Sequence, residues 1–253
     1  MDAPQTITDS KQLKGKTPLQ RTRLYIGDGG LLSHVVQKDT GEGLVGAKEL
    51  EAFGLLVHPF WVDDPEGLEG QAYQAYITGH PDFGLSVRHG VAERLAQAQK
   101  QLPMGWQIVL KAGFRPLEVQ YRLFDDAHTY LRDKHPYWSD DKLLEETRKL
   151  VADPRVRVPP HSTGAAVDIE ILNTATNQLV DMGARANTDG EAGWAYSPVI
   201  TKTQQARRLT LLKAMLDVGF ANHAYEWWHF SWGDAVWAVF YDQPATQYAL
   251  LGT

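Results

Sequence analysis

The stretch His161-Ser-Thr-Gly-Ala-Ala-Val-Asp-Ile-Glu-Ile171 decides the fold, because it combines a turn with a strand that follows directly. From Ala165 to Ile171 apolar side chains alternate with acidic ones, the pattern of a strand with one apolar face. The acidic face carries Asp168 and Glu170. A carboxylate fixed on a rigid strand suits a metal ligand, and Gly164 lets the backbone pass close to a bound ion. Glu170 is either a partner of such a site or an exposed residue.

A second stretch, Glu226-Trp-Trp-His229, lies near the other end of the chain. Two histidines and one carboxylate are enough to hold a zinc ion and to leave a position open for water. His161, Asp168 and His229 supply these three ligands. Glu226 adds a carboxylate with no evident structural role, so the set matches the requirements of a zinc hydrolase.

Each stretch also has a simpler interpretation. His161 and Asp168 are compatible with a capped turn and a surface strand. Glu226 to His229 is compatible with an aromatic core strand whose polar ends reach solvent. On a regular strand, residues three apart face opposite sides, so a shared site requires a bulge, a twist or a turn between Glu226 and His229. The remaining histidines, His223 among them, are interpreted as surface or core residues.

Arg115 lies in Gly113-Phe-Arg-Pro116, where a strand gives way to a helix. A cation at a helix start is slightly unfavourable, because the positive end of the helix dipole lies there. Its presence indicates a nearby anion, for which a developing oxyanion is one candidate. The alternative is an ordinary surface arginine.

Composition limits the class of protein. The chain has 253 residues, of which 43% are hydrophobic and 22% are charged, as in ordinary globular proteins. Its formal net charge is −6 and no block of Lys and Arg appears, which argues against a nucleic-acid partner. No apolar run reaches the length that spans a membrane, so no membrane partner is expected. The sequence does not determine the oligomeric state.

Cysteine usage and the N-terminus bear on location. There is no cysteine, which excludes disulfides and cysteine zinc sites and fits a reducing compartment. The segment that begins at Met1 lacks a basic region followed by an apolar run, so it is not a signal peptide. We therefore expect a cytoplasmic protein.

The predicted elements are helices and strands without regular βαβ alternation. The expected strands cover residues 24–26, 106–112, 165–171 and 225–232, with a returning hairpin strand from residue 179. The expected helices cover residues 87–101, a segment that follows Pro116, residues 140–151 after Ser139, and a segment that begins in a capping box at Thr201. The predicted fold class is α+β, with a small, mainly antiparallel central sheet flanked by helices and a zinc site at the sheet. Residues 1–69 are expected to form an N-terminal extension that packs on or covers a catalytic domain of residues 70–253.

These motifs resemble a known family. Gly113-Phe-Arg-Pro116, His161 to Asp168, and Tyr225-Glu-Trp-Trp-His229 resemble, in order and approximate spacing, the signature blocks of the bacterial D-alanyl-D-alanine dipeptidases. The resemblance covers roughly residues 70 to 233. It implies one zinc ion bound by His161, Asp168 and His229, with Glu226 as general base and acid and Arg115 stabilising the transition state. It also implies a small dipeptide substrate and a role in peptidoglycan and cell-wall metabolism.

The chain departs from the family around the substrate. The known dipeptidases have serines where this chain has Pro159-Pro160. They also have a Met-Gly stretch followed by a Phe-Asp pair whose aspartate binds the substrate ammonium. Here Met182-Gly183 is present but, in an ungapped comparison, the aspartate position falls on Ala186. The candidate substrate-binding residues are Ser162, Asp189 and Glu191, the last two as replacements in a shifted loop.

The function indicated is therefore zinc-dependent hydrolysis of D-alanyl-D-alanine or a closely related dipeptide. Two alternatives stay open. A murein D,D-carboxypeptidase or endopeptidase would use the same chemistry on longer peptides, which the altered 183–199 loop favours and the missing export signal disfavours. A non-catalytic, zinc-stabilised binding module is disfavoured by the presence of both Glu226 and Arg115.

Overall fold

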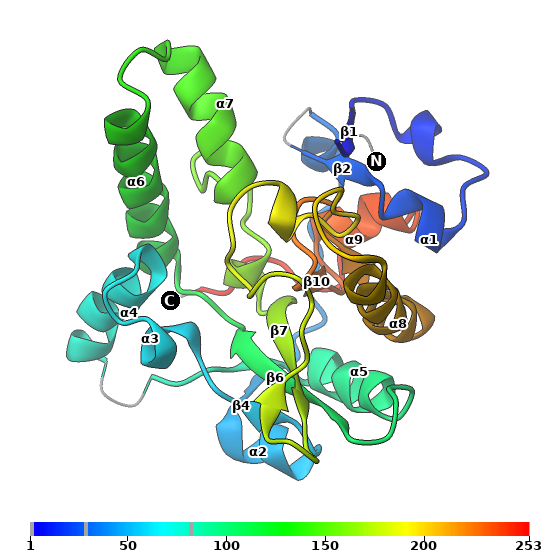
Figure 1. Ribbon diagram of the computed structural model, residues 1–253. Helices are drawn as coiled ribbons and strands as arrows, with labels where there is room; N and C mark the ends of the chain where they lie inside the picture. The colour runs from blue at the N-terminus through cyan, green and yellow to red at the C-terminus, as the bar shows by residue number, and fades with distance from the viewer. Residues whose placement is uncertain (1–2, 28–29, 81–82, 253) are drawn as a thin grey trace.

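A six-stranded sheet forms the centre of the computed structural model, which describes residues 3–27, 30–80 and 83–252 (Figure 1). The strand order is β4-β6-β7-β10-β9, and β8 pairs with β7. The strands of this sheet are β4 (Leu56–Val57), β6 (Trp106–Ala112), β7 (Ala166–Asn173), β8 (Gln178–Leu179), β9 (Ala221–Asn222) and β10 (His229–Ser231). Met1 and Asp2, where the segment tested for a signal peptide begins, lie outside the described residues.

The central sheet is mixed, which corrects the expectation of a mainly antiparallel sheet. β4 pairs with β6 in parallel, whereas the pairs made by β7 with β6, β8 and β10 are antiparallel. β4 has two residues, too few for an alternating pattern, and it comes from the segment expected to be an extension. Parallel neighbours also need a long connection, and the segment between β4 and β6 supplies it. The prediction of mixed helices and strands is confirmed.

The register of β7 fixes the position of the acidic face. Leu110 pairs with Ile169 and Ala112 pairs with Asp168, so Lys111 is an extra residue in a β-bulge. On its other side, Asp168 lies directly opposite His229. Residues paired across neighbouring antiparallel strands have their Cβ atoms about 5 Å apart. The register therefore brings together two residues that are 61 positions apart in the sequence.

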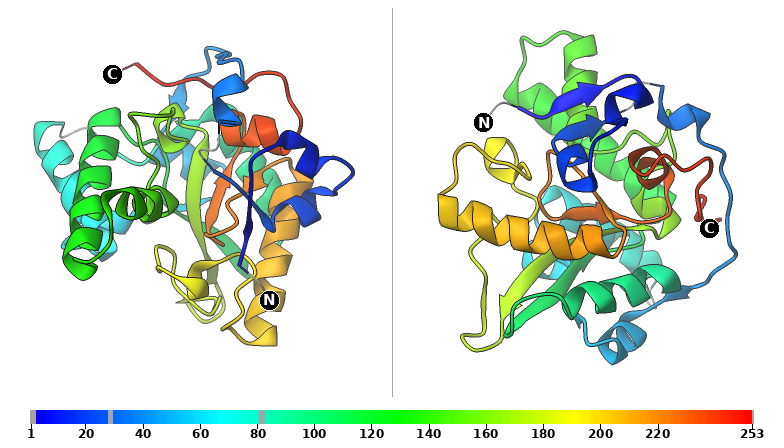
Figure 2. Two further views of the ribbon diagram at one scale, coloured as in Figure 1. Left: turned by 90° about the horizontal axis from the view of Figure 1, so that it is seen from above. Right: turned by 90° about the vertical axis from the view of Figure 1, so that its right-hand side faces the viewer.

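Helices cover both sides of the sheet. Figures 1 and 2 show α5 and α8 on one face, and α4, α6 and α7 on the other side, where α6 and α7 project as an arm. The helices are α1 (Pro18–Arg21), α2 (Ala47–Ala52), α3 (Phe60–Asp63), α4 (Leu68–Gly79), α5 (His89–Gln99), α6 (Leu117–Lys134), α7 (Asp140–Leu150), α8 (Lys202–Asp217) and α9 (Ala235–Phe240). Within the described residues, no helix is long and apolar enough to cross a membrane.

Two helix starts follow the predicted caps. The Ser139 hydroxyl accepts a hydrogen bond from the Lys142 N–H at 3.3 Å and begins α7. The Thr201 hydroxyl accepts from the Gln204 N–H at 3.2 Å, and the Gln204 side chain accepts from the Thr201 N–H at 2.8 Å. Both predictions are confirmed, because a cap depends only on residues three apart.

Residues of the expected N-terminal extension pack closely against the rest of the chain. β1 (Gln5–Ile7) and β2 (Leu24–Ile26) form a parallel pair, and β3 (Leu44–Val45) pairs with β5 (Val87–Arg88). Ile7 and Leu13 are fully buried, and α1 contacts α8. These contacts place much of residues 3–69 in the common core, while the division at residue 69 stays a prediction.

Short 3₁₀ turns and the C-terminal tail complete the fold. The 3₁₀ turns are η1 (Ser10–Leu13), η2 (Leu32–His34), η3 (His161–Thr163) and η4 (Glu191–Gly193). The C-terminal tail packs back as expected, since Tyr248 is fully buried and the Leu251 N–H donates to the Ser162 carbonyl at 3.2 Å. The tail thus supports the turn that carries His161.

Candidate active site

Three segments carry the candidate metal ligands. His161 begins the turn η3, which ends at Gly164 in the left-handed conformation with φ of 74°. This left-handed conformation favours glycine, and a Cβ here would also displace the Leu44 methyl group that lies 2.7 Å away. Asp168 comes from β7 and His229 from the first residue of β10.

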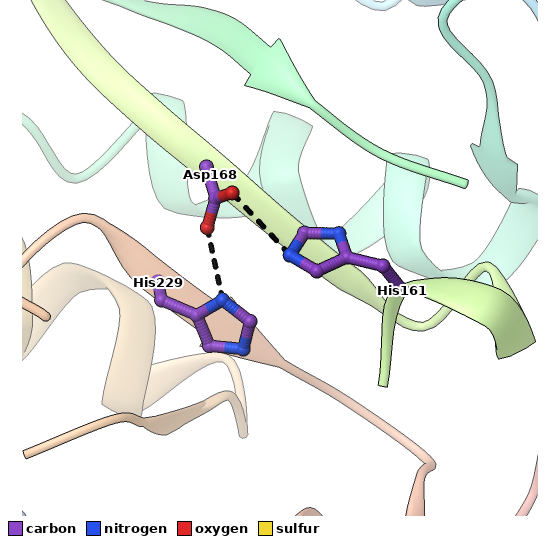
Figure 3. A group of neighbouring side chains, drawn as sticks. All are labelled: His161, Asp168 and His229. Atoms are coloured by element: carbon purple, nitrogen blue, oxygen red, sulfur yellow. Dashed lines mark hydrogen bonds and ion pairs between the residues drawn. The ribbon is translucent and has the colours of Figure 1, made fainter. Parts of the chain in front are cut away.

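The predicted ligands meet at one point. The ligand atoms of His161, Asp168 and His229 all lie within 4.8 Å of one another. Asp168 Oδ2 is 3.3 Å from His161 Nε2, and Asp168 Oδ1 is 2.9 Å from His229 Nδ1. Figure 3 shows the two imidazole rings directed at the two oxygens of one carboxylate. Two imidazole nitrogens and a carboxylate oxygen at this separation fit a zinc ion.

The surroundings of His161 leave one of its nitrogens available for a metal, whereas those of His229 act differently. His161 Nδ1 lies 2.8 Å from the Gly113 carbonyl oxygen, so this nitrogen donates and Nε2 keeps its lone pair for the site. Burial lowers the pKa of His161, which favours the neutral imidazole that binds metals. Burial would raise the pKa of Asp168, but the two histidines outweigh it and hold that pKa well below its usual value. For His229, burial acts to lower the pKa. The hydrogen bond to Asp168 outweighs it, so the pKa of His229 is raised.

Glu226 reaches the same site through a turn. The expected strand over 225–232 is shorter than predicted, because Tyr225 to Trp228 form turns and β10 begins at His229. The His229 N–H donates to the Glu226 carbonyl at 3.3 Å, which returns the chain within three residues. Glu226 Oε2 consequently lies 3.6 Å from His229 Nδ1. The turn required for a shared site is present.

The electrostatic setting of Glu226 suits proton transfer. Burial raises the pKa of its carboxyl to about 7. Trp227 and Trp228, the two residues that follow Glu226, are each 4% exposed and belong to the hydrophobic core. A group with a pKa near the working pH can both accept and donate a proton. His223 Nδ1 lies 3.7 Å from Glu226 Oε2, so this histidine lies at the site and is not an unrelated surface or core residue. Its position three residues before Glu226 is the one sequence signal that could have indicated it.

Arg115 is buried and already has an anion. Its backbone N–H donates to the His161 carbonyl at 3.1 Å, and its Nη2 donates to Glu69 Oε1 at 2.7 Å. The nearby anion predicted for Arg115 is thus a carboxylate of this chain. Glu69 was not predicted as a site residue, because the 46 positions between it and Arg115 leave no local sequence pattern.

Most of the predicted site residues, but not all, line one cavity. A cavity of about 1050 Å³ is lined by Arg115, His161, Asp168, Asp189, Glu226 and His229, among others. Asp189 lies at its accessible rim, where partial burial raises the pKa of the carboxyl. Ser162 is fully buried and Glu191 is exposed at the start of η4, and neither lines the cavity. Glu170 is buried and pairs with Arg185 at 2.6 Å.

Comparison with known proteins agrees with this geometry. The family described as D-Ala-D-Ala dipeptidase, peptidase M15, matches residues 84–250. A D-alanyl-D-alanine dipeptidase of Synechocystis sp. is 30% identical over 230 residues, covering 81% of this chain and 88% of the relative. The D-alanyl-D-alanine dipeptidase of Enterococcus faecium is 26% identical over 163 residues, covering 61% and 79%, respectively.

A site with two histidines, an aspartate and a neighbouring glutamate defines a metallopeptidase. Within that class, the chain belongs to the D-Ala-D-Ala dipeptidase family of zinc peptidases. The predicted resemblance is therefore confirmed. The match begins at residue 84, later than the motifs indicated, and ends at residue 250, further than they indicated. It therefore includes the C-terminal tail that supports η3.

Proposed function

We propose that this protein hydrolyses D-alanyl-D-alanine, or a closely related dipeptide, to free amino acids with one zinc ion held by His161, Asp168 and His229. The observation that supports this most is the position of Glu226, whose carboxylate lies 3.6 Å from the ligand nitrogen of His229. A base beside a three-ligand site is the arrangement that peptide hydrolysis by a metallopeptidase requires.

The proposed chemistry divides between the metal and the chain. When bound, zinc supplies a Lewis acid and lowers the pKa of water from about 15.7 to about 7. Glu226 takes a proton from the attacking water and then gives it to the leaving amine. Its pKa of about 7, raised by burial, suits both steps near neutral pH.

Arg115 supplies a positive charge in the same cavity as Glu226. Among the described residues, its Nε, Nη1 and Nη2 atoms each donate one hydrogen bond, to Tyr73, Gln120 and Glu69. A guanidinium has five N–H groups, so two remain for the charge that develops on the scissile carbonyl oxygen. The bonds to the chain hold the guanidinium in place before the reaction, which lowers the cost of using it.

A dipeptide has charged groups at both ends, so fixed counter-charges in a pocket can select its length. Asp189 at the rim is our candidate for the contact with the substrate ammonium. Ser162 and Glu191 remain weaker candidates, since neither lines the cavity.

The decisive test is a dipeptide panel assayed on metal-analysed protein. Ala-Ala in its four stereochemical forms, together with D-Ala-D-Ser and D-Ala-D-lactate, would be followed by release of free amino acid. We expect cleavage of D-Ala-D-Ala in preference to the L,L form. No turnover of any dipeptide by zinc-loaded protein would refute the proposal.

The ligand assignment has its own test. His229→Ala is expected to lose bound zinc, because it removes one of three protein ligands, whereas His89→Ala changes an imidazole that is 50% exposed on α5. Metal content after dialysis and the loss of tryptophan-monitored stability on chelation give readouts that do not depend on turnover. Full zinc occupancy in His229→Ala would remove His229 from the ligands.

Longer peptides that end in D-Ala-D-Ala are the second candidate substrates. The cavity of about 1050 Å³ lies at the upper end of the range for drug-sized ligands, about 300–1,000 Å³. It extends to Tyr130, Trp138 and Lys149 on the α6–α7 arm. Assaying an acylated peptide that ends in D-Ala-D-Ala beside the free dipeptide separates the two functions.

The expected cytoplasmic location stays a prediction, which fractionation of the producing cells tests.

A further inference from the structure

Glu69 joins three separate segments at the edge of the candidate active site. It lies in the first turn of α4, before the region that the family comparison matches, and its side chain is 10% exposed. One carboxylate oxygen, Oε1, accepts from Arg115 Nη2 at 2.7 Å. The other, Oε2, accepts from Asn187 Nδ2 at 2.7 Å. A single side chain therefore contacts both the arginine and the loop that follows Met182.

The loop contact is the only described hydrogen bond of the Asn187 side chain. Asn187 adopts the left-handed conformation with φ of 63°, which asparagine tolerates better than most residues. Its neighbours are held separately, since Glu170 pairs with Arg185 and accepts from the Ala186 N–H at 3.1 Å. Glu69 thus holds the part of the loop that leads to Asp189 at the pocket rim.

The charge of Glu69 also determines where Arg115 points. Arg115 is 6% exposed, so its guanidinium depends on protein groups for compensation. Burial acts to lower the pKa of Arg115, but the charge of Glu69, in direct contact at 2.7 Å, and that of the metal-ligand candidate Asp168 outweigh it and raise that pKa. Without the charge of Glu69, Asp168 would be the remaining carboxylate that attracts the guanidinium, so the orientation of Arg115 in the cavity would change.

We propose that Glu69 is a positioning residue of the site, which orients Arg115 and fixes the loop around Asn187 through its two carboxylate oxygens. The catalytic part of this proposal rests on the proposed function, whereas the loop part does not. Glu69→Gln keeps the size of the side chain and removes its charge. Glu66→Gln is the matched control, because Glu66 is exposed just before the same helix and does not line the cavity.

Activity gives the first readout. A misplacement of about 1 Å can cost on the order of a hundredfold in rate. We expect Glu69→Gln to lower kcat by about 10- to 100-fold, with a smaller change in KM and unchanged zinc content. Glu66→Gln should match the wild type. A kcat for Glu69→Gln within twofold of this control would overturn the proposal.

A second variant separates positioning from a general loss of stability. Asn187→Asp brings a second carboxylate against Glu69 and should also lower kcat. In the double variant Glu69→Gln and Asn187→Asp, the new amide can donate to the new carboxylate, so we expect a kcat close to that of Glu69→Gln alone rather than the product of the two losses. Asn187→Asp by itself tests the contact even if Glu69→Gln folds poorly. Losses that multiply in the double variant would contradict the proposed contact.

Hydrogen exchange of the loop gives a readout that is independent of turnover. We expect peptides covering residues 184–190 to exchange faster in Glu69→Gln than in Glu66→Gln at equal thermal stability. If the wild type cleaves no dipeptide, the proposed function fails, yet this measurement still decides the role of Glu69. Equal exchange in the two variants would overturn it.

Discussion

The Glu226 carboxylate combines burial with a short distance to His229, a candidate metal ligand, and each has a separate consequence. Burial raises its pKa to about 7, and the turn before β10 places it 3.6 Å from His229. The group can therefore accept or donate a proton near neutral pH, and it is not one of the three candidate ligands.

We predict that Glu226→Gln keeps zinc but loses on the order of a hundredfold or more in kcat, because general acid–base catalysis contributes roughly that much. Steady-state rates and metal analysis of the same samples check this. Glu118→Gln on α6 is the control, since Glu118 does not line the cavity. Near-normal turnover would exclude Glu226 from the chemistry.

Arg115 gives the second prediction at this scale. Its guanidinium donates from three nitrogens to Tyr73, Gln120 and Glu69. Lysine carries the same charge on one nitrogen and cannot reproduce this planar arrangement. We expect Arg115→Lys to lower kcat by about tenfold or more, while Arg122→Lys on the exposed side of α6 leaves it unchanged. An unaltered rate in a folded Arg115→Lys protein would leave Arg115 only a structural role.

The residues of the site differ in how far the sequence could predict them. His161, Asp168, Glu226 and His229 lie in two short motifs, and a motif carries its chemistry in local spacing. Glu69, the carboxylate partner of Arg115, lies in no such motif. Asn187 and Glu69 are 118 positions apart, and no pattern in either segment indicates their contact.

At the scale of elements, the sequence predicted helices and strands correctly where neighbouring residues alone determine them. The strand over Trp106–Ala112 and the start of α7 at Asp140 agree with prediction to the residue. The strand expected over 225–232 was too long, because a tryptophan-rich turn has the same composition as a buried strand. β4 was missed because two residues carry no periodicity.

The start of α8 provides a prediction for an element. Thr201 caps the helix, which buries Leu211, Leu212 and Met215 against the sheet. We expect Thr201→Ala to lower the free energy of unfolding by about 1 kcal/mol, because it leaves N–H groups of the first turn without an acceptor. Urea denaturation measures this directly. Thr203→Ala, at an exposed position in the same turn, should change stability little, and equal effects of the two substitutions would contradict the capping assignment.

At the scale of the whole molecule, three buried cations, Arg88, Lys111 and Arg115, tie described residues of the N-terminal segment to the rest of the chain, and Arg115 does so through Glu69. Arg88 donates to Asp39 Oδ2 at 2.6 Å, and Lys111 pairs with Asp63. The Arg88 side chain is 1% exposed, and its Nε also donates to the Thr163 carbonyl at 2.8 Å. Arg88 therefore connects the N-terminal segment to the turn that carries His161. Composition and periodicity could not predict this, because the pairing depends on tertiary packing between distant segments.

The acid sensitivity of the protein should follow from these pairs. Burial alone would raise the pKa of Asp39, but hydrogen bonds from Gly41 and Ala249 and the charge of Arg88 lower it. A carboxyl whose pKa is lower in the folded state contributes stability above its unfolded value of about 3.9, and this contribution is lost as the pH falls below that value. The pKa of Asp63 is lowered in the same way. Burial would raise it, but the hydrogen bonds and charges of Lys111 and His58 outweigh burial.

We therefore predict that Asp39→Asn lowers the free energy of unfolding by about 2 kcal/mol at pH 7, because it weakens a charged hydrogen bond to a buried arginine. The difference from the wild type should shrink as the pH falls below about 4 and through the lowered pKa of folded Asp39, because the carboxyl is then protonated in both states of the wild type. Urea midpoints measured across this range test the sign. Asp133→Asn, an exposed change on α6, should follow the wild type at every pH. A difference that grows on acidification would show that Arg88 does not depend on the charge of Asp39, and that the N-terminal segment is held to the His161 turn by apolar packing instead.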